Sequence, residues 1–135
     1  MKIVVDAYAW VEIFVGSGAG EKAKQIIEQA DEVLTPGTVV AEVACKYHRG
    51  GVEESTIHAR LETISVASHV VPISIELALE AAKCYMKLSQ EARRRKLSTP
   101  SLFDAITLAT ARLMEAKVIT GDEHFKSLPE TIWIE

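Results

Sequence analysis

Short apolar segments alternate with longer amphipathic segments along the chain. The short segments carry β-branched residues and predict β-strands, whereas the longer ones predict α-helices. Strands separated by helices favour a parallel sheet covered on both faces. We therefore predict an α/β fold, a three-layer α/β/α sandwich with a mainly parallel central sheet. The predicted strands are Lys2–Val5, Asp31–Pro36, His69–Ser74, Lys117–Thr120 and Thr131–Glu135.

The helical segments have clear boundaries. Gly16–Gly18 ends the first helix and Gly50–Gly51 the third, because glycine is favoured at helix C-termini. Pro72 suits a strand at the sheet edge. The predicted helices are Ala7–Val15, Glu21–Ala30, Thr38–His48, Glu53–Val66, Ile75–Arg93 and Ser101–Glu115, with one further helical turn at Glu123–Ser127.

The length of 135 residues predicts one domain, residues 1–135. No apolar run reaches the roughly 18 residues of a membrane span, and the N-terminus shows no signal-peptide pattern. Cys45 and Cys84 lack CxxC spacing and are expected to be reduced core thiols. These features predict a cytoplasmic protein without a membrane segment.

Two carboxylates directly follow predicted strands. Asp6 follows Ile3–Val5, and Asp122 follows Lys117–Thr120 after one glycine. In parallel α/β sheets, ligands bind at the carboxyl ends of the strands, so both acids are candidate site residues. Each could instead only cap the helix that follows it, since Asp is a preferred N-cap residue.

Two further acids can reach the same edge of the sheet. Asp104 lies near the start of a predicted helix, and Ser101 three positions earlier also makes it a candidate capping-box residue. Glu42 lies inside a helix, where the alternative is a solvated surface glutamate. Clustered carboxylates repel one another unless a cation is present, and all-oxygen ligands suit Mg²⁺ or Mn²⁺.

The acids stand within longer motifs, Val4-Val5-Asp6, "DAITLATA" at 104–111 and "ITGDEHF" at 119–125. With Glu42, these motifs make the whole chain resemble the PIN-domain family, and within it the VapC-type toxins of prokaryotic toxin–antitoxin pairs. Thr120, Asp122 and Phe125 fit the last family motif. Two residues depart from the family pattern. Tyr8 stands two positions after the first acid, where a small hydroxyl or amide residue is often found. Gly121 stands between the Thr and the Asp of the last motif, where Arg is common.

The resemblance implies a metal-dependent endoribonuclease that hydrolyses RNA phosphodiester bonds with a metal-activated water. Asp6 and Asp104 would be direct Mg²⁺ (or Mn²⁺) ligands, and Asp122 a direct or water-mediated one. Glu42 would hold a second ion or orient the attacking water. A cognate antitoxin protein and a homodimer are further implications, and apolar residues on 53–66 and 75–93 are candidate dimer contacts.

The net charge of −4 is unusual for a protein that binds RNA. The 19 acidic residues exceed the 15 basic residues by four, as many as the candidate site acids, so the rest of the chain is neutral. Arg93–Lys96 is a basic run close in sequence to Asp104. It is either a solvent-exposed helix end, where cations are favoured, or a contact for RNA phosphates or an antitoxin.

Two other classes of function fit the same elements. A Mg²⁺-dependent small-molecule phosphohydrolase or a phospho-acceptor receiver domain uses a similar sheet, but usually places paired acids near the first strand, whereas Asp6 is followed by Ala7-Tyr8-Ala9. A non-catalytic PIN-like interaction module would work by binding alone. The complete set of four acids argues against that module.

Overall fold

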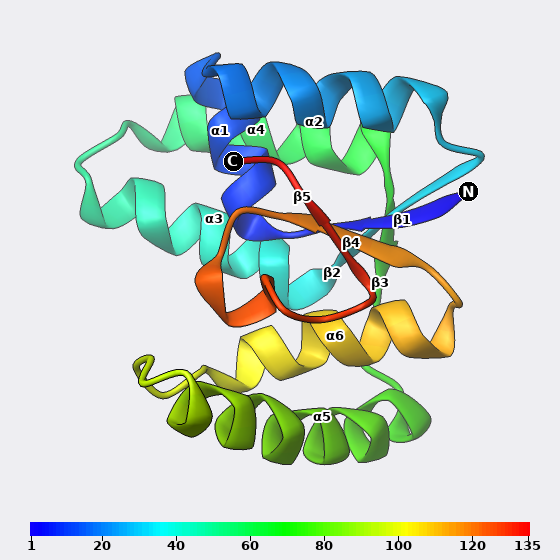
Figure 1. Cartoon of the computed structure of the whole chain (residues 1–135). Helices are drawn as coiled ribbons and strands as arrows, with labels where there is room; N and C mark the ends of the chain where they lie inside the picture. Colours follow the sequence, from blue (N-terminus) through cyan, green and yellow to red (C-terminus); the bar gives the residue numbers. More distant parts are fainter.

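A computed structural model describes all residues, 1–135, and has a five-stranded sheet between two layers of helices (Figure 1). All neighbouring strands pair in parallel, in the order β3-β2-β1-β4-β5. The predicted α/β/α sandwich is therefore confirmed. The strands are β1 Lys2–Val5, β2 Glu32–Pro36, β3 His69–Val71, β4 Lys117–Thr120 and β5 Thr131–Trp133.

Six helices connect the strands, and a 3₁₀ turn, η1, follows β4. In Figure 1, α5 and α6 lie on one side of the sheet and α1, α2 and α4 on the other. The helices are α1 Ala7–Val15, α2 Gly18–Gln29, α3 Gly37–Arg49, α4 Glu54–Ala67, α5 Ile75–Arg94 and α6 Leu102–Leu113, and η1 covers Glu123–Phe125. No helix is long and apolar enough to cross a bilayer.

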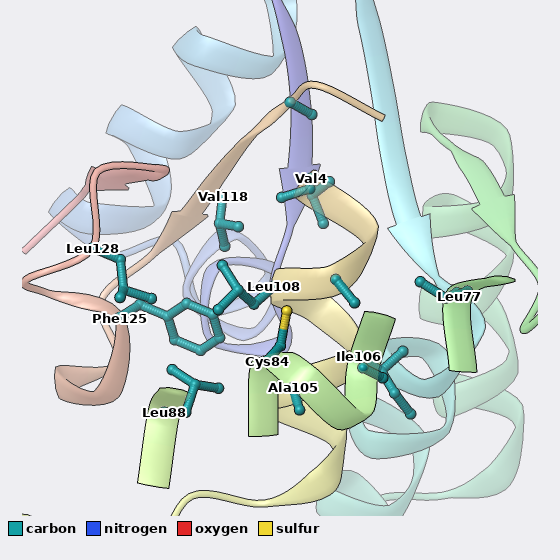
Figure 2. Close-up of a cluster of buried hydrophobic side chains, with 14 of the residues drawn as sticks. Val4, Leu77, Cys84, Leu88, Ala105, Ile106, Leu108, Val118, Phe125 and Leu128 are labelled. Carbon is teal, nitrogen blue, oxygen red and sulfur yellow. The ribbon is translucent and has the colours of Figure 1, made fainter. Parts of the chain in front are cut away.

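The alternation of side chains along β1 divides the core into two clusters. Val4 belongs to the cluster under α5 and α6, whereas Ile3 and Val5 belong to the cluster under α1–α4. Figure 2 shows the ring of Phe125 in the first cluster, together with Leu88 from α5. The packing of Phe125 therefore holds η1, the segment that follows β4, against the layer formed by α5 and α6.

The order of the strands creates a switch point beside β1. The chain first proceeds outward from β1 to β2 and β3, and then returns to the other side of β1 to form β4 and β5. Crevices form at the carboxyl ends of strands where the order reverses in this way. Here the crevice lies between the ends of β1 and β4, the strands that precede Asp6 and Asp122.

Two local predictions were wrong. The helix predicted from Glu21 begins at Gly18, because the Ser17 hydroxyl caps it by accepting the Gly20 N–H. Gly20 also packs against α1 so closely that a Cβ there would overlap the Glu12 carbonyl. A glycine run that suggested a loop thus serves helix packing. Cys84 is buried as expected, but Cys45 is exposed because it faces away from the core stripe of α3. The edge position predicted for the strand that contains His69 is confirmed.

Candidate active site

The four predicted acids line one cleft of about 440 Å³. Asp6 and Asp122 approach it from the ends of neighbouring parallel strands, whose register pairs Val5 with Ile119. Asp104 enters from the first turn of α6 and Glu42 from the middle of α3. The structure thus brings together all four side chains from segments that are far apart in the sequence.

Asp6 is the deepest of the four acids, with only 5% of its surface exposed. Although it precedes α1, its side chain makes no capping hydrogen bond. It accepts a hydrogen bond from the Thr120 hydroxyl at 2.8 Å. Burial raises its pKa to about 7, with further contributions from Asp104 and Asp122. The capping explanation therefore fails for Asp6.

Thr120 links the ends of the two strands. Its fully buried hydroxyl donates to Asp6 and accepts from the backbone N–H of Asp122 at 3.0 Å. A hydroxyl can serve both partners because it is a donor and an acceptor at once. Thr120 therefore fixes the position of one acid relative to the other.

If the acids form the metal site that the sequence predicts, replacing Thr120 by Val should lower the RNA-cleaving activity about 10- to 100-fold, the usual effect of losing a group that orients metal ligands. Thr120→Ser keeps the hydroxyl and should retain most of the activity. Both rates can be measured on a fluorescent RNA substrate, with circular dichroism to confirm folding. Equal activity of the Val and Ser variants would show that the hydroxyl has no orienting role.

Asp104 combines the two roles that the sequence left open. One carboxylate oxygen accepts from the backbone N–H of Ser101 at 2.9 Å, while the Asp104 N–H donates to the Ser101 hydroxyl at 3.1 Å. This capping box leaves the other oxygen free of hydrogen bonds. Partial burial raises the Asp104 pKa despite the bonds to Ser101. Capping therefore does not prevent Asp104 from holding a cation.

His124 is a member of the site whose role the sequence did not reveal. Its Nε2 lies 2.8 Å from the Ser98 carbonyl and its Nδ1 lies 2.9 Å from Asp122 Oδ1. Both partners are acceptors, so a doubly protonated ring satisfies both contacts. Partial burial alone would lower the His124 pKa, but the bonds to Ser98 and Asp122 raise it overall.

These contacts make His124 a counter-ion of Asp122 rather than a metal ligand. One ring nitrogen, together with one oxygen each of Asp104 and Asp122, lies within a 4.8 Å group that could hold an ion. However, both His124 nitrogens are already engaged. Asp122 also accepts the His124 backbone N–H at 2.9 Å. The backbone and the ring of His124 therefore both hold the same Asp122 oxygen, Oδ1.

Glu42 has no compensating partner. Burial raises its pKa to about 8, and Asp6, Asp104 and Asp122 add to the increase. No hydrogen bond contributes to that pKa. Of the four carboxylates, only Asp122 is paired with a cationic group, the His124 ring. An all-oxygen donor set with such an excess of negative charge fits a divalent cation such as Mg²⁺ or Mn²⁺.

The two departures from the family pattern, Tyr8 and Gly121, explain each other. A Cβ at position 121 would lie 2.8 Å from the Tyr8 Cζ and 2.7 Å from the Glu135 Cγ. The Tyr8 hydroxyl donates to the Glu135 carboxylate, which raises the Tyr8 pKa to about 12. The Tyr8 ring thus forms a wall of the cleft and occupies the space that a side chain at position 121 would need.

Gly121→Ala should destabilise the fold by about 1–3 kcal/mol, because its methyl group overlaps the Tyr8 ring. In a Tyr8→Ser background the same change should cost much less, so the two positions should show a coupling energy in the range of 0.5–3 kcal/mol. Urea unfolding of the four proteins measures this cycle. If Gly121→Ala costs the same in both backgrounds, the two residues do not depend on each other.

The basic run Arg93–Lys96 does not line the cleft. Arg94 pairs with Glu91 at 2.7 Å, while Arg95 donates to the Glu123 carbonyl at 2.8 Å and pairs with the carboxylate of the same residue. The only contact of the run with the segment beside the site is the one between Arg95 and Glu123 of η1. Two of the run's four charges, those of Arg94 and Arg95, are thus paired with neighbouring acids, which the sequence alone could not indicate.

The PIN-domain family model matches residues 3–130. The chain therefore belongs to the PIN-domain family, which is a family of nucleases. No curated protein matches the sequence. The resemblance inferred from the motifs around the four acids is thus confirmed at the level of the family.

Solved structures agree with the fold over nearly the whole chain. A toxin–antitoxin complex from Klebsiella pneumoniae has a TM-score of 0.68 at 23% identity, over 98% of both chains. VapC20 of Mycobacterium tuberculosis, described as a sarcin–ricin loop cleaving toxin, has a TM-score of 0.68 at 19% identity, over 94% of this chain and 95% of VapC20. VapBC2 from Rickettsia felis, bound to a promoter DNA fragment, has a TM-score of 0.67 at 15% identity, over 98% and 97%.

Proposed function

We propose that this chain is a Mg²⁺- or Mn²⁺-dependent endoribonuclease. The observation that carries the proposal is the meeting of four carboxylates from distant segments in one cleft, where only Asp122 is paired with a cation. Carboxylate clusters of this kind hold the divalent ions used in phosphoryl-transfer chemistry. Membership of a nuclease family supports the same conclusion.

Each acid has a distinct place in the proposed reaction. Asp6, held by Thr120, and Asp104, with one free oxygen, would hold the metal ion directly. Asp122 would bind directly or through a water, in the orientation set by His124. A bound ion supplies water activation and neutralises charge on the phosphate. Glu42 would hold a second ion or orient the attacking water.

We further propose that the protein acts in the cytoplasm as the toxin of a VapBC-type toxin–antitoxin pair, with an antitoxin protein as partner. The support is the likeness to toxin and toxin–antitoxin structures. Tyr8 leaves all four carboxylates in the cleft, which argues against the non-catalytic module.

A homodimer is the expected assembly. Ile75, Leu79 and Met86 of α5 are 84%, 64% and 57% exposed, and large exposed apolar patches mark interaction surfaces. Sedimentation equilibrium at micromolar concentration should give about twice the 14.8 kDa mass of one chain. A mass near that of a single chain would contradict the dimer.

A metal-dependence assay tests the proposed enzyme activity. Purified protein should cleave a single-stranded RNA in Mg²⁺ or Mn²⁺ and not in EDTA. A small phosphomonoester assayed in parallel distinguishes a phosphohydrolase, which would release phosphate from it. Binding of RNA without cleavage in either metal would support the interaction module instead.

A further inference from the structure

The cleft changes its charge along α3. Glu42, Lys46 and Arg49 are spaced i, i+4 and i+7, which places them on one face of the helix. All three line the cleft that contains the acids. The end of the cleft that contains Glu42 and the other acids is therefore negative. The end reached further along α3, at Lys46 and Arg49, is positive.

The two cations at that end have no partner within the protein. The lysines and arginines that form ion pairs are Lys2, Lys83, Arg94, Arg95 and Arg112. Lys46 and Arg49 form no ion pair and no side-chain hydrogen bond, and both are exposed. They are also the only basic residues of the cleft lining. Their charges are thus available to a ligand.

We propose that Lys46 and Arg49 bind successive phosphates of an RNA strand whose scissile phosphate lies at the four acids. At a rise of 1.5 Å per residue, they stand about 6 Å and about 10 Å from Glu42 along the helix axis. The strand would therefore run along α3, from the acids towards Arg49. The inference rests on the proposed ribonuclease function, because it assumes that the acids mark the scissile phosphate.

The physical reason is the charge of the substrate. A cluster of four acids repels an approaching RNA strand, and cations along the strand path offset this repulsion. Grooves that bind single strands generally use basic side chains to follow the backbone, with little dependence on sequence. Arg93–Lys96 does not supply this charge to the cleft, because Arg94 and Arg95 are paired and the run lies outside the lining.

The test compares two double variants of equal charge. Lys46→Gln with Arg49→Gln removes the proposed contacts, and Lys24→Gln with Lys87→Gln removes two exposed charges outside the cleft. Each is made in an Asp104→Asn background, and binding of a fluorescent random single-stranded RNA pool is measured in Mg²⁺ at several salt concentrations. The cleft variant should bind roughly tenfold more weakly, and its salt slope should fall by about 1.4, since each contact with a single strand contributes about 0.7.

Cleavage kinetics of the same double variants, made without the Asp104→Asn change, supply a second readout. The cleft variant should raise KM about tenfold with kcat changed less than about twofold, because the lost contacts are remote from the reacting phosphate. Lys46→Arg with Arg49→Lys keeps both charges, so its KM and salt slope should lie closer to those of the parent chain than to those of the cleft variant. Circular dichroism confirms folding, which Gln should preserve as a good helix former.

The outcomes separate this inference from the proposed function. Absence of metal-dependent cleavage by the unchanged chain would refute the ribonuclease, whereas the binding assay would still measure the contacts. Cleavage with equal KM and equal salt slope in the cleft and control variants would refute the phosphate contacts and leave the ribonuclease standing. Absence of any RNA binding by the Asp104→Asn protein overturns the inference.

Discussion

Asp6→Asn is expected to lower RNA cleavage in Mg²⁺ by at least about a hundredfold, because groups that only orient metal ligands already account for 10- to 100-fold. Asn has nearly the same size and can still accept the hydrogen bond from Thr120. The fold should therefore persist. Without metal the variant should even unfold at a higher temperature than the parent chain, because a buried charge has been removed.

Asp31→Asn is the matched control. Asp31 is the only aspartate outside the cleft, and its exposed ion pair with the N-terminal amine contributes little to stability. This variant should cleave RNA like the parent chain. Full cleavage activity of Asp6→Asn under the same conditions would show that Asp6 holds no catalytic ion.

The stability of the metal-free protein should fall as the pH rises from about 5 to about 8. The pKa of Asp6 is raised from 3.8 to about 7 and that of Glu42 from 4.5 to about 8. Over that interval the native state binds more protons than the unfolded state, so the free energy of unfolding decreases with pH. The raised pKa of His124 acts in the same direction. Together these groups predict a decrease in Tm of roughly 5–10 °C.

Saturating Mg²⁺ should remove most of this decrease. The ion binds the deprotonated carboxylates of the native state, so it stabilises the fold by mass action and most strongly near pH 8. Differential scanning fluorimetry at pH 5 to 8, in EDTA and in Mg²⁺, measures both effects. A Tm in EDTA that rises over this interval would contradict the unneutralised cluster, and an equal Mg²⁺ shift at pH 5 and pH 8 would contradict binding by these acids.

The placement of the acids could be predicted because it follows from local pattern and topology. Asp6 and Asp122 directly follow short apolar strands, and parallel strands bring their carboxyl ends to one edge of the sheet. The capping motif of Asp104 was also visible in the sequence. What the pattern could not decide was whether capping excluded a second role, because that depends on the unused carboxylate oxygen.

Other features depend on contacts between residues distant in sequence. The charge of His124 depends on the Ser98 carbonyl, and Arg95 is engaged by Glu123. Gly20 looks like part of a flexible run until α1 is packed against it. Lys46 and Arg49 show helical spacing from Glu42 in the sequence, but only the folded cleft shows that they lack partners.

The central claim is that the four carboxylates form one divalent metal site, and anomalous diffraction from crystals grown in Mn²⁺ tests it most directly. We predict an anomalous peak in the cleft, at about 2.0–2.2 Å from carboxylate oxygens of Asp6 and Asp104, with Asp122 and Glu42 around it. The peak should vanish in Asp6→Asn crystals grown in the same way. A cleft without a peak at millimolar Mn²⁺, or an ion held elsewhere on the protein, would contradict the claim.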